Sequence, residues 1–203
     1  MATTEKLDLY KKHRAEYAAT RKPQLVTVRP AKYLTIQGRG APGGDVFQAK
    51  IAAMYGMAFT IKFTAKFAGK EYAVCKLEGR WWGKRKHGDF SKEPKPTWNW
   101  KLLIRTPDFI AARQLTAAVK QLEQRGKSGD FGDVKLERIT EGRCVQMLHV
   151  GPYEKEGETM AAMQAFVEQQ GLAFHGLHHE IYLSDPRRVE PARLRTILRM
   201  PVK

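Results

Sequence analysis

The sequence predicts an α+β protein built from two pseudo-symmetric β-α-β-β repeats, with antiparallel sheets packed around a central ligand cleft. The first observation is the order of strand-like and helix-like patterns, which is the same in residues 26–108 and 133–203. The second is a pair of matching segments, LLIRTP at 102–107 and TILRMP at 196–201. The third is that each repeat holds three strands and one helix, too few to close a core alone, so the two must pair. A seam between paired repeats is a natural ligand cleft.

The first repeat begins with an alternating pattern from Val26 to Arg39, which runs into the glycine-rich turn at 38–44. That turn lacks the lysine of a Walker loop and fits no dinucleotide fingerprint, so it is typical of a plain strand-to-helix turn. Asp45 can cap the next helix, whose apolar residues recur every three or four positions to about Lys66. Two further strands and a basic connector complete the repeat: 71–82, the connector 83–97, and 98–105.

A helix at 109–125 links the two repeats. The second repeat contains, in order, a strand at 134–150, an amphipathic helix that ends at Gly171, and strands at 178–183 and 194–202. The residues before the first repeat carry a few apolar positions among many charges, which indicates a short amphipathic arm that packs on the body. The predicted domain organisation is therefore an N-terminal arm at 1–25 and one domain at 26–203.

The composition is that of a globular protein with a strong basic bias. The chain has 203 residues, of which 42% are hydrophobic, and a formal net charge of +15 at pH 7. No apolar run approaches a membrane span and the N-terminus has no signal-peptide core, so we expect a cytoplasmic protein without membrane contact. The charge favours weak, non-specific nucleic-acid affinity, but no zinc-finger spacing, RNP-type strand or basic zipper is present. Cys75 and Cys144 lack metal-ligand spacing and a disulfide-rich context, and the oligomeric state is not predicted.

All four tryptophans fall within 77–109, in two pairs on either side of the connector. Trp98 and Trp100 are two residues apart, so their rings share one face of a strand. Their neighbours on the other face are polar, which favours a pocket wall over a core position. Trp81 and Trp82 alternate, so one of them faces the cleft while the other caps the core.

Four motifs occur in order along the chain: LEGRWW (77–82), WNWKLLIRTPDF (98–109), HVGPYEKEGETMAAM (149–163) and HHEIYLSDPRRVEPARLRTILRMPV (178–202). Over residues 26–203 they resemble the GyrI-like small-molecule-binding proteins, named for a DNA gyrase inhibitory protein. The double tryptophan followed by Trp-x-Trp is most similar to a stand-alone subfamily that includes cyclopropanoid cyclohexadienone hydrolases. The resemblance implies an aromatic cage in the cleft, an acidic residue inside it, and the opening of a strained ring in DNA-alkylating natural products. Other family members only bind drugs, often as the sensor half of transcription regulators, but no helix-turn-helix pattern occurs here.

Glu180 is the candidate catalytic residue. It lies in an alternating strand, so His178, Glu180 and Tyr182 share one face, while His179 and Ile181 face the other way. A carboxylate beside tyrosine and tryptophan rings is partly desolvated, which makes it a better base near neutral pH. The residues by themselves favour a solvent-facing glutamate paired with an arginine, whereas the resemblance favours a position in the cleft.

Two further candidates come from outside this strand. Glu78 belongs to the equivalent hairpin of the first repeat, so it either faces the same seam or is a surface charge beside Lys76 and Arg80. Tyr153 lies at the turn before the second helix. Its side chain either reaches the mouth of the cleft or packs against the start of that helix. The predicted ligand-binding residues are Trp81, Trp98, Trp100, Tyr153, Tyr182, Glu78 and His178.

The histidines do not form a metal-binding pattern. His178 and His179 point to opposite faces of a strand, and no cysteine or aspartate completes a site with His149 or His175. We therefore expect neither a metal nor a cofactor. No Ser-His-Asp set is evident either.

Three functions remain open. The first is hydrolysis of cyclopropanoid DNA-alkylating compounds, which would protect the cell, with Glu180 positioning the attacking water. The second is a non-catalytic module that sequesters planar aromatic or cationic small molecules by ring stacking and a buried counter-charge. The third is an inhibitor protein that acts on gyrase or nucleic acid through its basic surface.

Overall fold

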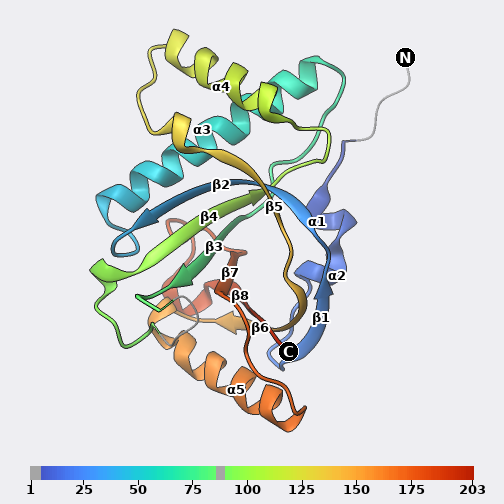
Figure 1. Cartoon of the computed structure of the whole chain (residues 1–203), viewed down its shortest axis with the longest axis vertical. Coiled ribbons are helices and arrows are strands. Elements are labelled where there is room, and N and C mark those ends of the chain that lie inside the picture. Colours follow the sequence, from blue (N-terminus) through green and yellow to red (C-terminus); the bar gives the residue numbers. More distant parts are fainter. Residues whose placement is uncertain (1–5, 86–89) are drawn as a thin grey trace.

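The computed structural model describes residues 6–85 and 90–203, and within these ranges eight strands form one antiparallel sheet (Figure 1). From edge to edge the order is β1-β6-β8-β7-β3-β4-β2-β5. The strands are β1 (Gln24–Val28), β2 (Ala31–Arg39), β3 (Leu77–Trp82), β4 (Asn99–Arg105), β5 (Lys135–Ile139), β6 (Gly142–Val150), β7 (His178–Tyr182) and β8 (Arg195–Pro201). The helices are α1 (Leu9–Lys12), α2 (Arg14–Tyr17), α3 (Asp45–Phe67), α4 (Ala112–Gln124) and α5 (Glu156–Gln169). Single 3-10 turns are η1 (Lys95–Thr97), η2 (Phe131–Asp133), η3 (Tyr153–Lys155) and η4 (Pro191–Arg193).

The predicted fold class is confirmed, because β2-α3-β3-β4 and β6-α5-β7-β8 are two β-α-β-β repeats. The repeats meet at the centre of the sheet, where β3 pairs with β7, and Gly79 lies directly opposite Glu180 in the ladder. The two predicted sheets are therefore one continuous sheet, and the seam between the repeats is the β3–β7 pair.

The sheet is curled rather than flat. β1 leads into β2 across two residues, Arg29 and Pro30, although the two strands are six positions apart in the sheet order. Three residue steps span only about 10 Å, whereas six strand spacings in a flat sheet would cover about 29 Å. The sheet must therefore curl. At its edges the repeats exchange strands: β1 pairs with β6 of the second repeat, and β5 pairs with β2 of the first. The curvature is visible in Figure 1.

Two strands of the sequence prediction are each split in the structure. The strand expected over Val26–Arg39 is interrupted at Pro30, which has no N–H to donate to a ladder. The strand expected over 134–150 breaks before Gly142, whose φ of +71° is readily adopted only by glycine. Each repeat thus contributes four strands to the sheet instead of three. The additional strands, β1 and β5, each pair with a strand of the other repeat.

The N-terminal arm packs on the body of the protein, as expected. Leu7 exchanges backbone hydrogen bonds with Glu71 and Ala73, at N···O distances of 3.0 and 2.8 Å. This pairing occupies the segment where the sequence predicted the start of a strand at 71–82, so β3 begins only at Leu77. Further along the arm, the buried Tyr17 packs in a cluster with Ile181 and Ile197.

α3 and α5 cover the same face of the sheet. Residues directly opposite each other in an antiparallel ladder share a face, and Trp81 is opposite both Trp100 and His178. The α3 residue Phe47 lies against both tryptophans, with ring centroids 5.6 Å from Trp81 and 5.0 Å from Trp100. On the other half, Leu198 is opposite Glu180 and packs in a cluster with Met163 of α5.

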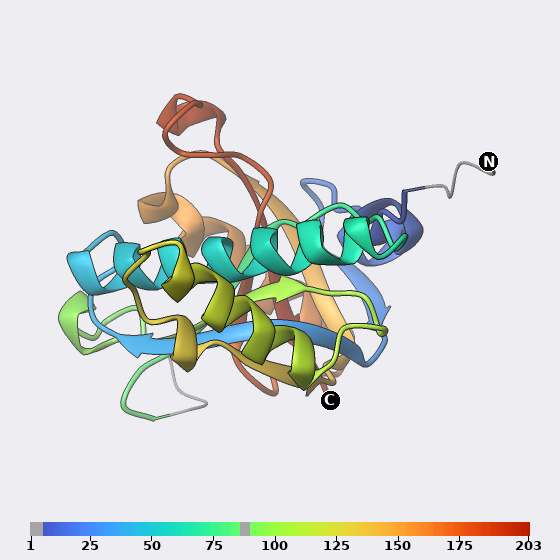
Figure 2. The same cartoon turned by 90° about the horizontal axis from the view of Figure 1, so that it is seen from above.

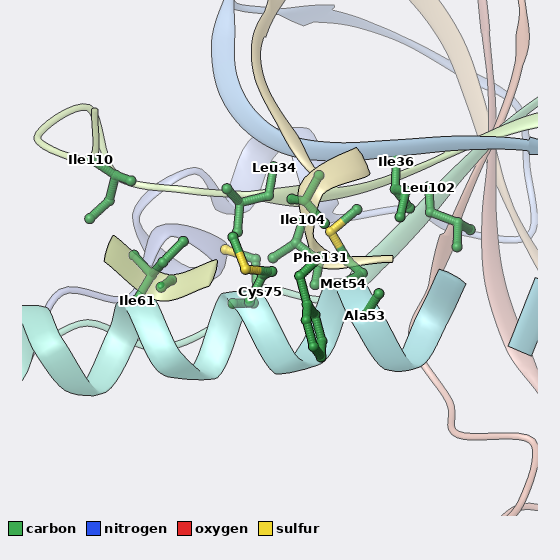
Figure 3. Packing of buried hydrophobic residues seen from close by; sticks show 14 of the residues in the cluster. Leu34, Ile36, Ala53, Met54, Ile61, Cys75, Leu102, Ile104, Ile110 and Phe131 are labelled. Carbon is green, nitrogen blue, oxygen red and sulfur yellow. The ribbon is translucent and has the colours of Figure 1, made fainter. Parts of the chain in front are cut away.

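The arrangement of the helices leaves the centre of this face uncovered by either helix. α3 and α4 lie side by side over one half of the sheet, and α5 lies over the other half (Figures 1 and 2). The largest hydrophobic core lies between α3 and strands β2 and β4, where Met54 and Ile61 belong to one cluster with side chains such as Leu34 and Ile104 (Figure 3). Among the described residues, no helix combines the length and apolar character needed to cross a membrane. Because neither α3 nor α5 covers the face of β3 and β7, we expect a functional site there.

Candidate functional site

Strand β7 places three polar side chains on the face between α3 and α5. His178 and Glu180 are hydrogen-bonded, with 3.0 Å between Nε2 and Oε1, and each is only 9% exposed. Two residues further, the hydroxyl of Tyr182 accepts a hydrogen bond of 3.2 Å from Nε1 of Trp81. The alternation of the strand puts His179 on the opposite face. The structure thus brings together Glu180, His178, Tyr182 and Trp81 of the predicted set.

Glu156, the first residue of α5, joins this group and was not predicted from the sequence. One carboxylate oxygen of Glu156, one of Glu180 and a ring nitrogen of His178 all lie within 4.8 Å of one another. Oε1 of Glu156 is buried and has no hydrogen-bond partner among the described residues. A glutamate in the first turn of a helix is ordinarily a surface charge that interacts favourably with the helix dipole. The sequence therefore carried no signal that singled out Glu156.

The protonation states in this cluster follow from burial and from the nearby carboxylates. Burial, followed by the charge of Glu180, raises the pKa of Glu156 well above its usual range. The same two causes raise the pKa of Tyr182 well above its usual range and that of Tyr153 to about 12. Among the described residues, no lysine or arginine forms an ion pair with either carboxylate, and Glu180 is instead hydrogen-bonded to His178. The cluster therefore holds neutral hydroxyl donors at pH 7 and lacks a fixed positive counter-charge.

Aromatic rings border the cluster on two sides. Trp98 packs edge-on against Trp81, with ring centroids 6.1 Å apart, and against Phe90 at 4.9 Å. Phe90 in turn lies 5.8 Å from the His178 ring, so the connector between β3 and β4 contributes a wall residue that the sequence did not indicate. On the other side, the ring of Tyr153 is 6.2 Å from that of Tyr182 and nearly perpendicular to it.

Trp100 lies in the core rather than beside the carboxylates. It is fully buried, and its ring packs edge-on against Phe47 beneath α3. Of the adjacent pair, Trp81 is on the site face and is 3% exposed, whereas Trp82 is opposite Asn99 on the other face. Trp81 is therefore the member of the pair that lies on the same face as Glu180.

Glu78 is not brought together with Glu180. It is adjacent to Gly79, which lies opposite Glu180, so the alternation of β3 directs Glu78 to the other face of the sheet. There it is fully buried, and its Oε1 accepts a hydrogen bond of 2.9 Å from the hydroxyl of Tyr17. Its Oε2 lies 3.0 Å from Nε2 of His179. Glu78 thus belongs to a polar network under the N-terminal arm.

Three donor atoms as close as those of Glu156, His178 and Glu180 also raise the question of a metal ion. The His178 imidazole and the Glu180 carboxylate are already hydrogen-bonded to each other, and Glu156 favours its neutral form. We therefore describe the cluster as acid–base groups, in which a metal ion would have to replace the hydrogen bond between His178 and Glu180.

The polar groups of the site are largely buried, since Glu180 and His178 are each 9% exposed. One surface hollow of the described structure is lined by residues that include Lys101 and Glu137, and another lies between the arm and Arg195. Neither lining includes Glu180 or Trp98. A ligand that reaches the carboxylates contacts the aromatic rings that border them, Phe90 among them.

Comparison with known proteins places this geometry in a family. A family model described as the GyrI-like small molecule binding domain matches residues 21–203. The chain belongs to the GyrI-like small-molecule-binding domain family. No curated protein sequence matches it significantly.

Solved structures of similar length share the GyrI-like fold. An uncharacterized conserved protein from Listeria innocua is 37% identical, with a TM-score of 0.91, over 98% of this chain and all of that one. A hydrolase from Listeria innocua is 36% identical, with a TM-score of 0.89 and the same coverage. The EcmrR C-terminal domain is 12% identical, with a TM-score of 0.58 over 90% of this chain and 97% of that one, which shows the GyrI-like fold alone.

Proposed function

We propose that this protein binds planar aromatic small molecules and hydrolyses the cyclopropane ring of cyclopropanoid DNA-alkylating compounds, which would protect the cell. The observation that carries the proposal is the position of Glu180, a buried carboxylate at the centre of an aromatic-bordered face with no lysine or arginine ion-paired to it among the described residues. The hydrolase label of a full-length relative at 36% identity supports the reaction class.

In the proposed reaction, a planar substrate stacks against Trp98 and Tyr153, which border the cluster on its two sides. Glu180 accepts a proton from a water molecule, whose oxygen attacks the methylene carbon of the cyclopropane ring. The ring bond breaks, and its electron pair moves into the conjugated dienone, which becomes a phenolate and, on protonation of its oxygen, a phenol. Orientation of the substrate and general-base help of about 10²- to 10⁴-fold accelerate a step that ring strain and aromatisation drive.

The test is to incubate the purified protein with a duocarmycin-type compound that carries the cyclopropane, and to follow ring opening by absorbance and mass. We expect a product heavier by one water, and a rate reduced by about 10²- to 10⁴-fold in Glu180→Gln. Glu158→Gln is the matched control, because Glu158 is exposed on α5 and should keep full activity. Conversion no faster than in buffer, or full activity of Glu180→Gln, would refute hydrolysis.

A second candidate is non-catalytic binding of flat cationic molecules. It is favoured by the pair Glu156 and Glu180, which together offer a counter-charge that no described lysine or arginine neutralises. In that case a planar cation quenches the tryptophan fluorescence without forming a product. Glu180→Gln then weakens binding of the cation more than that of a neutral analogue of the same shape.

A further inference from the structure

This inference rests on the proposed hydrolysis. We propose that Glu156 is the general acid of the reaction and that it shares a single proton with Glu180, the general base. The sequence does not link these two residues, because Glu156 begins α5 and Glu180 lies in β7. The structure brings one carboxylate oxygen from each within 4.8 Å, with a ring nitrogen of His178 at the same range.

Two carboxylates at this distance in a buried place do not both ionise readily, because like charges in a low dielectric repel. Among the residues that the structure describes, the groups facing Glu156 include no lysine or arginine that would offset that repulsion. They are Glu180, His178 and Tyr182 from β7, and Tyr153 and Glu154 from η3. One proton is therefore retained by the pair near neutral pH.

The hydrogen bonds decide which residue carries the proton. The Glu180 carboxylate is hydrogen-bonded to Nε2 of His178 and lies close to the hydroxyl of Tyr182, and donors of this kind favour an ionised carboxylate. Oε1 of Glu156 is buried without a partner among the described residues, so no such donor favours its ionised form. The raised pKa of Glu156 agrees with this assignment. At neutral pH, Glu180 is the base and Glu156 is the acid.

Glu180 and Glu156 together account for both protons that move in the reaction. Glu180 takes a proton from water as the water oxygen bonds to the ring carbon. The electron pair of the broken carbon–carbon bond moves to the dienone oxygen, which takes the proton of Glu156. After product release, Glu180 is protonated and Glu156 is ionised. The separation of 4.8 Å or less lets the proton return through one bridging water.

The first experiment is the pH dependence of kcat for the wild type, Glu156→Gln and the control Glu158→Gln. We expect the wild-type rate to fall at alkaline pH as Glu156 loses its proton. Glu156→Gln should be slower by about 10²- to 10⁴-fold and should lack this alkaline fall. A merely structural role would lower the rate without changing the shape of the profile, so an alkaline fall retained in Glu156→Gln overturns the proposal.

The second experiment separates this inference from the proposed function. Infrared spectroscopy at pH 7 should show the C=O stretch of a protonated carboxyl group in the wild type and Glu158→Gln, and its loss in Glu156→Gln. Absence of the band from the wild type refutes the shared proton, whatever the activity. A band without ring opening refutes the hydrolysis, and with it the general-acid role, but supports the shared proton. Stoichiometric zinc or manganese together with turnover that a chelator abolishes would overturn the acid–base pair in favour of a metal.

Discussion

At the scale of the residue, the geometry of the site depends on the absence of a side chain at position 79. Gly79 lies directly opposite Glu180 in the β3–β7 ladder. A Cβ atom there would come within 2.6 Å of the Tyr182 hydroxyl and 2.9 Å of Nε1 of Trp81. These two groups are hydrogen-bonded to each other beside the carboxylate. The glycine therefore leaves the space in which tyrosine and tryptophan fix the surroundings of Glu180.

We predict that Gly79→Ala displaces the Tyr182 and Trp81 side chains and lowers the free energy of unfolding by about 1–3 kcal/mol, as overpacking of a filled site does. Urea unfolding followed by tryptophan fluorescence measures the change. Gly132→Ala is the matched control, because a Cβ atom at Gly132 meets no atom within 4 Å. Equal stability of the two variants would show that the contact at position 79 relaxes freely.

At the scale of the element, loops and the turns before helices supply side chains of the site that the strands do not. β7 and β3 supply Glu180 and its neighbours, but Phe90 comes from the connector between β3 and β4, and Tyr153 comes from the turn η3 before α5. Each of these aromatic rings packs against a side chain of β7, at His178 and at Tyr182. The walls of the site thus belong in part to segments that carry no periodic pattern, which is why the sequence did not indicate Phe90.

We predict that Phe90→Ala weakens binding of a planar ligand between about twofold and tenfold, the equivalent of one lost aromatic contact. Fluorescence titration with a duocarmycin-type compound or a planar cation measures the dissociation constant. Phe67→Ala serves as the control, because Phe67 is 87% exposed at the end of α3. Tighter binding by Phe90→Ala would instead mean that Phe90 blocks the site.

At the scale of the whole molecule, the curled sheet separates two polar groups of side chains. One face carries the Glu156–His178–Glu180 cluster between α3 and α5. The other face holds a buried ion-pair network in which His179 bonds to Glu141 and lies close to Glu78. The arm enters this network, because Glu16 pairs with Arg105 at 2.6 Å and both side chains are nearly inaccessible. The arm therefore closes the face of the sheet opposite the site.

We predict that Glu16→Gln lowers the free energy of unfolding by about 3 kcal/mol, because removing one partner of a buried ion pair leaves the other charge uncompensated. Asp108→Asn removes an exposed partner of Arg138 at 4.0 Å and should cost less than about 1 kcal/mol. Paired urea unfolding curves give both values. A Glu16→Gln variant as stable as Asp108→Asn would show that the arm does not help to hold the sheet closed.

The sequence by itself determined the α+β class, the two repeats and the common face of His178, Glu180 and Tyr182, because helix and strand periodicities are local properties of the chain. Only the tertiary structure decided which residues from other elements meet that face. The β3–β7 register sets Gly79, and not Glu78, beside Glu180. Helix α5 brings Glu156 to the same place, and packing under α3 buries Trp100. Register and helix docking depend on contacts between segments far apart in sequence, which no local pattern records.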